Sequence, residues 1–208
     1  MPKSTEALET RLLPSEDCQL RTSKDGKITG YAAVFNRRSL DLGGFREEII
    51  PGAFKEVLAG SPDTICGIDH EGGLSLLGRT VSGTLQIEED AAGLLVNCTP
   101  PDTSAGRDAR CLIERGDIRG MSFAFRVAPN GDSWREEPDG TMVRTISKVS
   151  KLADVTVATR PAYPDTSVAC RSLDDHKAAR EAATKNEKPS GPSPDALRRR
   201  AEIARRMG

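Results

Sequence analysis

The sequence is poor in aromatic residues, which make up 4% of its 208 residues and include one tryptophan. A hydrophobic core must therefore be built mainly from valine, isoleucine, leucine and alanine side chains. Residues 1–10 lack the apolar segment of a secretory signal, and no apolar run approaches the length of a membrane-spanning helix. We therefore expect a soluble protein without a visible export signal and without a role at a membrane.

Histidine is also scarce, and the five cysteines are scattered without a Cys-x-x-Cys pair. Two histidines and widely spaced cysteines are too few for a Cys/His zinc site. An odd number of scattered cysteines favours buried, reduced thiols. The glycine-rich phosphate loop, the Gly-x-Gly-x-x-Gly fingerprint and the His-Glu-x-x-His motif are all absent. We expect neither a metal nor another cofactor.

Charge is nearly balanced at -1 overall, which gives no general reason to expect nucleic-acid binding. Residues 174–208 differ from the rest, with nine Lys/Arg against six Asp/Glu. Residues 174–192 within this stretch have almost no large apolar side chains, which favours a solvated chain. We therefore predict one ordered domain in residues 1–173, followed by a charged, largely disordered tail with a possible short basic helix in residues 195–207.

Short strands separated by turn residues dominate the predicted domain. The strand predictions cover residues 7–13, 28–35, 45–50, 64–68, 76–81, 84–88, 94–98, 120–127, 142–146 and 152–158, and residues 167–172 are expected to close the ordered part. Two short helices are predicted, one at residues 53–58 and one capped by Asp102 or Thr103 and ended by Gly116. This pattern predicts an α+β fold, a small, mostly antiparallel β-barrel or curled sheet with a few outer helices.

Ser122 is the single hydroxyl in the sequence Gly-Met-Ser-Phe-Ala-Phe of residues 120–125, which is predicted to begin a buried strand. It is either a core hydroxyl bonded to nearby backbone or a nucleophile fixed on a rigid element. On this evidence alone the first interpretation is favoured. The Gly-x-Ser-x-Gly elbow of other hydrolases is not formed, because residue 124 is alanine and no helix follows.

Two histidines could act as a base beside such a serine. His70 follows a predicted strand and precedes the glycine pair at 72–73, so it is either a groove-facing base or an exposed loop residue. His176 lies in the charged tail, where we expect a solvated side chain. Asp154 is an acid within the alternating strand 152–158; it points either outward to water or inward to a hydrogen-bonded partner such as histidine.

Five segments, taken in order, resemble one known family. They are Ile-Thr-Gly-Tyr-Ala-Ala-Val-Phe (28–35), Glu-Ile-Ile-Pro-Gly-Ala-Phe (48–54), Asp-His followed by Leu-Gly-Arg (69–79), Gly-Asp-Ile-Arg-Gly-Met-Ser-Phe-Ala-Phe (116–125), and Leu-Ala-Asp-Val-Thr through Pro-Ala-Tyr-Pro (152–164). Together they resemble the prohead (capsid maturation) serine proteases of tailed bacteriophages, relatives of the herpesvirus assemblin proteases. Residues 48–54 carry the most specific match.

The resemblance implies a serine endopeptidase with a herpesvirus-protease-like fold. It implies Ser122 as the nucleophile, His70 as the general base and Asp154 as the third member, which orients His70. Asp154 stands where the family usually has glutamate, and Ala124 stands where it usually has glycine. The shorter carboxylate alters the reach toward His70 and leaves open that another group completes the site. Backbone amides and an arginine such as Arg144 are the candidates for stabilising the oxyanion.

The resemblance also implies the biological setting. Such an enzyme acts inside the immature capsid, the prohead, in the host cytoplasm. Its substrates are the scaffold or the scaffold-like arm of the major capsid protein, and itself; a homo-oligomer is compatible with this role. Residues 174–208 are then either a targeting segment removed by self-cleavage or an ordinary disordered terminus. The alternatives are a non-catalytic capsid assembly or scaffolding protein that keeps the fold and, less favoured, an unrelated β-barrel binding module.

Overall fold

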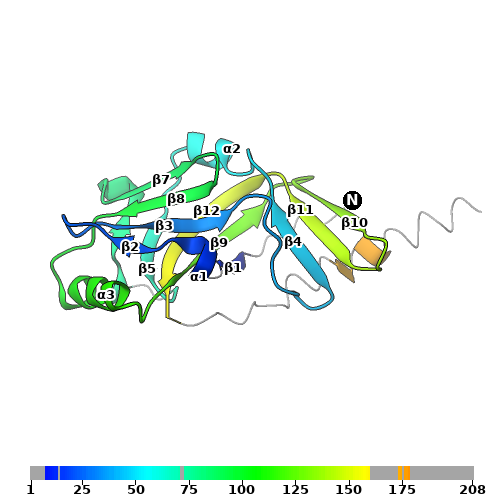
Figure 1. The fold of residues 1–208 in the computed structure, drawn as a ribbon. Helices are drawn as coiled ribbons and strands as arrows, with labels where there is room; N and C mark the ends of the chain where they lie inside the picture. Colours follow the sequence, from blue (N-terminus) through cyan, green and yellow to red (C-terminus); the bar gives the residue numbers. More distant parts are fainter. Residues whose placement is uncertain (1–7, 14, 71–72, 160–172, 175, 179–208) are drawn as a thin grey trace, which may run out of the picture. The chain divides into compact units, whose positions relative to one another are not determined.

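The computed structural model describes residues 8–13, 15–70, 73–159, 173–174 and 176–178 (Figure 1). The chain divides into two units, residues 1–173 and 174–208, and the fold below is that of the first. The segment expected to close the ordered part, residues 167–172, and the helix expected at 195–207 lie outside the described residues. Within the described part, no helix is long and apolar enough to span a membrane.

The described strands lie in three open sheets. The first has the order β1 (Glu9–Leu13), β9 (Gly120–Val127), β12 (Val149–Ala158), β5 (Ile65–Ile68), β6 (Gly78–Arg79). The second has the order β10 (Asp132–Glu136), β11 (Met142–Ile146), β4 (Phe45–Ile49), and the third the order β2 (Arg21–Thr22), β3 (Ile28–Val34), β8 (Gly93–Cys98), β7 (Leu85–Glu89).

All described pairings are antiparallel except those of β12 with β5 and of β11 with β4. The predicted α+β class is confirmed, with many short strands and few short helices. The described strands do not close into a barrel, which was one of the two expected arrangements.

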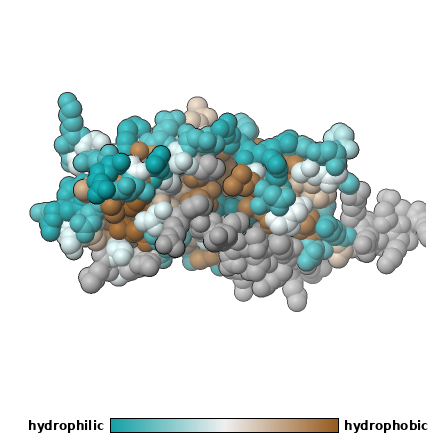
Figure 2. Space-filling view, turned by 60° about the horizontal axis from the view of Figure 1, so that its bottom comes forward, coloured by the Kyte–Doolittle hydropathy of each residue, from teal (hydrophilic) through white to brown (hydrophobic). Residues whose placement is uncertain are grey.

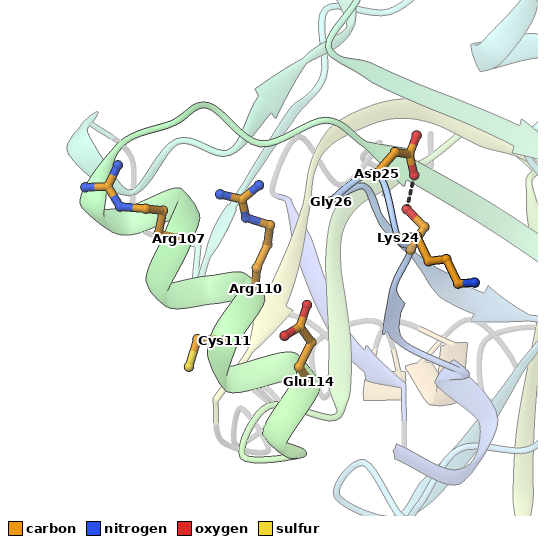
Figure 3. Close-up of a pocket in the computed structure, with 8 residues that line it drawn as sticks. Lys24, Asp25, Gly26, Arg107, Arg110, Cys111 and Glu114 are labelled. Atoms are coloured by element: carbon orange, nitrogen blue, oxygen red, sulfur yellow. Dashed lines mark hydrogen bonds between the residues drawn. The ribbon is translucent and has the colours of Figure 1, made fainter.

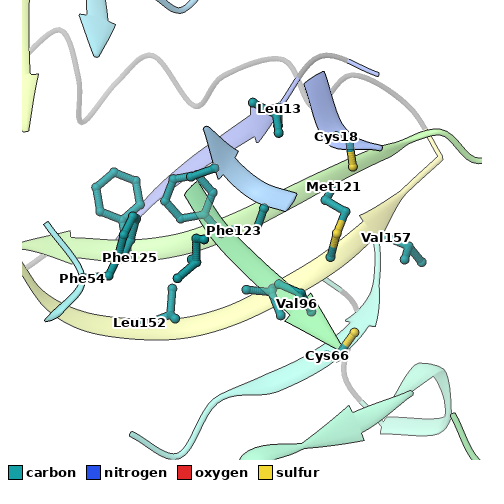
Figure 4. Close-up of a cluster of buried hydrophobic side chains, with 14 of the residues drawn as sticks. Leu13, Cys18, Phe54, Cys66, Val96, Met121, Phe123, Phe125, Leu152 and Val157 are labelled. Atoms are coloured by element: carbon teal, nitrogen blue, oxygen red, sulfur yellow. The ribbon is translucent and has the colours of Figure 1, made fainter. Parts of the chain in front are cut away.

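Strand β9 shows why the sequence folds this way. Met121, Phe123 and Phe125 alternate along it and are almost fully buried in the main core. The rings of Phe123 and Phe125 stack with centroids 4.8 Å apart, and Phe54 meets Phe123 edge-on at 6.0 Å (Figure 4). Because side chains alternate across a strand, the same pattern places Ser122 on the opposite face of the sheet.

The helices are short and mostly follow the sequence signals. Helix α3 (Ser104–Arg115) begins at Thr103, whose hydroxyl accepts a hydrogen bond from the amide of Gly106, and ends at Gly116 with φ of +80°. Helix α2 is Lys55–Ala59, close to its predicted place. Helix α1 (Ser15–Cys18) was not predicted from the sequence, and at four residues it is too short to show a periodic pattern.

The strand predicted at residues 76–81 is largely wrong. Only Gly78–Arg79 form a strand there, and a 3-10 turn (Thr80–Ser82) follows directly. Gly83 adopts a left-handed conformation with φ of +70°, which ends the turn and returns the chain to β7. Of the apolar residues in this stretch, Leu77 is fully buried whereas Val81 is 67% exposed, a pattern that alternation along a strand does not predict. A second 3-10 turn spans Gly73–Ser75.

Candidate active site

The middle of the first sheet fixes the position of Ser122. Its strand β9 is flanked by β1 on one side and by β12 on the other. Leu12 is its cross-strand partner in β1, and Thr156 is its partner in β12. Ser122 is completely buried among the described neighbours. A serine held between two paired strands has little freedom to move its backbone, as a positioned nucleophile requires.

A tight turn at the end of β5 brings His70 over the sheet. Asp69 and His70 both take left-handed conformations, with φ of 51° and 61°, which are uncommon for residues other than glycine. The Asp69 carboxylate accepts hydrogen bonds from the Thr159 amide, at 2.7 Å, and from the Thr159 hydroxyl. These bonds tie the turn to the end of β12 and hold the backbone conformation that aims the imidazole.

The structure brings Ser122, His70 and Asp154 together in one hydrogen-bonded line. His70 Nε2 lies 2.6 Å from Ser122 Oγ, and His70 Nδ1 lies 2.6 Å from Asp154 Oδ1. A neutral imidazole that donates from Nδ1 to the carboxylate leaves Nε2 free to accept the serine proton. The His70 and Asp154 side chains are 24% and 17% exposed, so the line is only partly screened by water. The other histidine, His176, lies in the second unit of the chain.

A bulge in β12 aims Asp154 at the histidine. The register with β9 shifts between Leu152 and Asp154, so that Leu152 pairs with Phe125 and Asp154 pairs with Ala124. Such an extra residue bends a strand and redirects the side chains beside it. Aspartate, one methylene shorter than the glutamate usual in the resembling family, reaches His70 here at hydrogen-bond distance.

Strand β1 adds a contact that sequence reasoning missed. The Ser122 hydroxyl lies 2.9 Å from the main-chain carbonyl of Arg11, to which it can donate. The strand itself was predicted, but a main-chain carbonyl leaves no mark in a sequence. The sequence gives no signal for this contact, because the buried side chains of the strand are Glu9, Arg11 and Leu13, and two of these are charged.

A buried cluster of charges anchors this strand. Arg11 donates to Glu47 at 2.7 Å and to Glu9 at 2.6 Å, and Arg144 donates to Glu9 at 2.7 Å and to Glu47 at 3.1 Å. Arg144 also donates from Nε to Asp132 at 2.7 Å. All but Asp132 are nearly fully buried. The cluster joins β1 to β4 and β11 of the second sheet, and paired charges of this kind are costly to break.

This cluster corrects one expectation. Arg144 was a candidate donor to the oxyanion, but it is 1% exposed and its guanidinium is bound by Glu9, Glu47 and Asp132. Burial lowers the pKa of Arg144, but these carboxylates outweigh it and raise the pKa above its ordinary value. Burial likewise raises the pKa of Glu9, but Arg144 and Arg11 outweigh it and lower the pKa. The guanidinium of Arg144 is thus fully engaged by carboxylates and is not available to bind an oxyanion at Ser122.

Two hollows adjoin the described surface. A groove of about 840 Å³ has a largely apolar wall that includes Leu13, Ala33 and Phe123, whose side chains belong to the main core and not to the face of the sheet that carries Ser122. Hydrophobic side chains reach the surface in patches between hydrophilic ones in the space-filling view of Figure 2. The second hollow, of about 520 Å³, lies between the β2–β3 turn and α3. Arg110 and other charged side chains of α3 line it (Figure 3). Neither hollow is lined by Ser122, His70 or Asp154.

No group of three or more His, Cys, Asp and Glu residues in the described ranges is placed to hold a metal ion. The cysteines Cys18, Cys66 and Cys98 are buried free thiols, whereas Cys111 is exposed. Burial raises the pKa of the Cys18 thiol to about 12, so it is protonated and unreactive near neutral pH. Among the described side chains, Ser122 is therefore the one nucleophile held beside a histidine.

A strand-borne serine aligned with a histidine and an acid is the arrangement of a serine hydrolase. The chain belongs to the caudovirus prohead serine protease family, whose model matches residues 15–179. It is 29% identical over 170 residues to the prohead protease of Enterobacteria phage HK97, and this alignment covers 79% of this chain and 70% of that protein. No solved structure gives a significant match.

Proposed function

We propose that this protein is a serine endopeptidase of phage capsid maturation, with Ser122 as nucleophile, His70 as general base and Asp154 as the acid that orients His70. The observation that carries the proposal is the continuous line of two 2.6 Å contacts through the His70 imidazole. Membership in a serine protease family supports the same roles. A non-catalytic scaffolding protein with the same fold has no need of this alignment, which favours the enzyme.

The proposed reaction begins with attack on a peptide bond. Ser122 Oγ forms a bond to the carbonyl carbon while its proton passes to His70 Nε2 and the carbonyl electron pair moves to oxygen. Collapse of this tetrahedral intermediate breaks the bond to nitrogen, and His70 gives its proton to the leaving amine. Asp154 accepts the Nδ1 hydrogen bond throughout, which keeps the tautomer fixed and stabilises the imidazolium.

Water completes the cycle. His70 takes a proton from a water molecule, whose oxygen attacks the ester carbon on Ser122 and forms a second tetrahedral intermediate. Its collapse breaks the bond to Ser122 Oγ, which regains a proton from His70, and the carboxylic acid product leaves. The sequence of proton transfers requires no metal or organic cofactor, in keeping with the side chains present.

The substrates follow from the family. We propose that the enzyme cuts the scaffold or the scaffold-like arm of the major capsid protein, and itself, inside the prohead within the host cytoplasm. Residues 174–208, with their dense charge, are the segment we propose as a targeting or self-cleaved tail.

Co-expression with the major capsid protein tests the proposal. We expect Ser122→Ala to fold normally but to abolish both cleavage of the capsid precursor and any shortening of the protease itself, measured by mass spectrometry. Ser133→Ala, at an exposed position of β10, is the matched control and should process normally. Undiminished processing by Ser122→Ala would overturn the assignment.

A further inference from the structure

Thr156 carries a buried hydroxyl that the proposed triad does not use. The residue is 1% exposed, and its Oγ1 is one of three buried side-chain polar atoms without a hydrogen-bond partner in the described part of the chain. The other two are Thr22 Oγ1 and Arg126 Nε. An unpaired buried hydroxyl destabilises a fold, and valine of the same shape would avoid that cost. Its presence therefore requires an explanation other than stability.

The position of Thr156 links it to the reacting atoms. It is the direct cross-strand partner of Ser122, and on its other side it pairs with Gly67 of β5. Its neighbours Val155 and Val157 point into the core, so Thr156 shares the opposite face with Ser122. Side chains that face each other across antiparallel strands have Cβ atoms about 5 Å apart. The free hydroxyl is thus within one hydrogen bond of a group attached to Ser122.

The proposed reaction needs a hydrogen-bond donor to the oxyanion, and the three aligned residues do not supply one. Negative charge develops on the carbonyl oxygen when Ser122 attacks, and enzymes stabilise it with prearranged donors. The β9 amides around Ser122 belong to ladders with β1 and β12, and Arg144 is committed to its carboxylates. Arg126 lies four residues along β9, about 13 Å from Ser122 at the spacing of an extended strand. Among the unpaired buried side-chain atoms in the described ranges, Thr156 Oγ1 belongs to the residue that pairs directly with Ser122.

We propose that Thr156 is a further catalytic residue, whose hydroxyl donates a hydrogen bond to the oxyanion of the tetrahedral intermediates formed on Ser122. This inference rests on the proposed serine protease function. The hydroxyl is unpaired in the resting enzyme because its acceptor exists only while the intermediate does. It carries no charge and loses no proton in the cycle, so it lowers the barrier without entering the proton transfers.

The test compares Thr156→Val with Thr156→Ser. The probe is an alkyl fluorophosphonate: Ser122 Oγ forms a bond to phosphorus, fluoride leaves, and the serine proton passes to His70. The phosphoryl oxygen occupies the place of the oxyanion. We expect Thr156→Val to react about 100-fold more slowly than the wild type, and Thr156→Ser to stay within a few-fold of it. The unfolding temperature of Thr156→Val should equal or exceed that of the wild type.

Thr22→Val is the matched control, because it removes an equally unpaired hydroxyl from β2, in a different sheet. It should change stability in the same direction and leave the labelling rate unchanged. Measurement across pH distinguishes the proposed role from an indirect one. A donor to the oxyanion lowers the rate at every pH and leaves the shape of the profile unchanged, whereas a group acting through Asp154 and His70 shifts the profile.

The outcomes separate this inference from the proposed function. Labelling of Ser122→Ala at the wild-type rate would overturn the proposed function itself. Labelling that depends on Ser122 but proceeds at the wild-type rate in Thr156→Val would overturn the role of Thr156 and leave the function standing. A shifted pH profile in Thr156→Val would likewise overturn it. A slow, stable Thr156→Val with an unshifted profile supports it.

Discussion

The Ser122 hydroxyl and the Arg11 carbonyl lie 2.9 Å apart, although 111 positions separate the two residues in sequence. A serine hydroxyl has one proton, so it donates either to this carbonyl or to His70 Nε2, and not to both. When His70 carries protons on both nitrogens, Ser122 accepts from Nε2 and donates to Arg11. When Nε2 is free, the proton can turn toward His70, as nucleophilic attack requires. Strand β1, which holds Arg11, thus offers the Ser122 hydroxyl an acceptor other than His70.

The hydrogen bond between Asp154 and His70 gives the first prediction. Asp154→Asn should keep the fold but lower the rate of Ser122 phosphonylation by about 10⁴-fold, because an amide can donate to Nδ1 and favour the wrong tautomer. The measurement is the rate of fluorophosphonate labelling at neutral pH. Asp108→Asn, at an exposed position of α3, is the control and should label normally. A wild-type rate for Asp154→Asn would remove Asp154 from the mechanism.

The buried charge cluster gives the second prediction. Arg144→Met should lower the free energy of unfolding by about 3–5 kcal/mol, because Glu9 and Glu47 lose a buried partner. Denaturant unfolding measures the change. Arg135→Met is the matched control on the neighbouring strand: its pair with Glu48 is 43% exposed on the arginine side, so the loss should stay below about 1 kcal/mol. Equal losses for both variants would contradict the role given to the cluster.

Glu9 gives the third prediction, which concerns pH. Its pKa is lowered in the folded protein, so its contribution to stability is complete above the ordinary glutamate value of about 4.3 and is lost as pH falls through the folded value. Glu9→Gln lacks this contribution. The stability difference between the wild type and Glu9→Gln should therefore be constant near neutral pH and shrink below about pH 4. Thermal unfolding from pH 3 to pH 7 measures it; a difference that grows on acidification would contradict the assignment.

Much of the fold was accessible to sequence reasoning, because its signals are local. The β-branched and aromatic run of β3 and the glycine at the end of α3 reflect backbone preferences that act within a few residues. The corner at residues 78–83 and helix α1 were not accessible, because their conformations depend on contacts between sheets. The division of strands among three sheets was likewise out of reach, since pairing partners far apart in sequence leave no periodic trace.

The candidate site was predicted from the family resemblance and not from local sequence signals. The apolar setting of Ser122 alone favoured a structural hydroxyl, and the resemblance of the surrounding segments reversed that preference. The structure then brings His70, 52 positions away in a left-handed turn, and Asp154, 32 positions away beside a bulge in β12, to Ser122. Neither the left-handed turn nor the bulge can be predicted from a single sequence. Thr156 could not be singled out from the sequence, because a hydroxyl is known to be unpaired only when the positions of all its neighbours are known.

The order of strands in the first sheet determines when the candidate site can assemble during synthesis of the chain. Strand β12 lies between β9 and β5, yet it is the last of the three to leave the ribosome. The serine and the histidine therefore belong to two halves that have no shared ladder until residues 149–158 arrive between them. A nascent chain that ends before residue 149 therefore has no ladder that holds the proposed nucleophile and base in line. The alignment of Ser122 with His70 can form only after β12 has been added between β9 and β5.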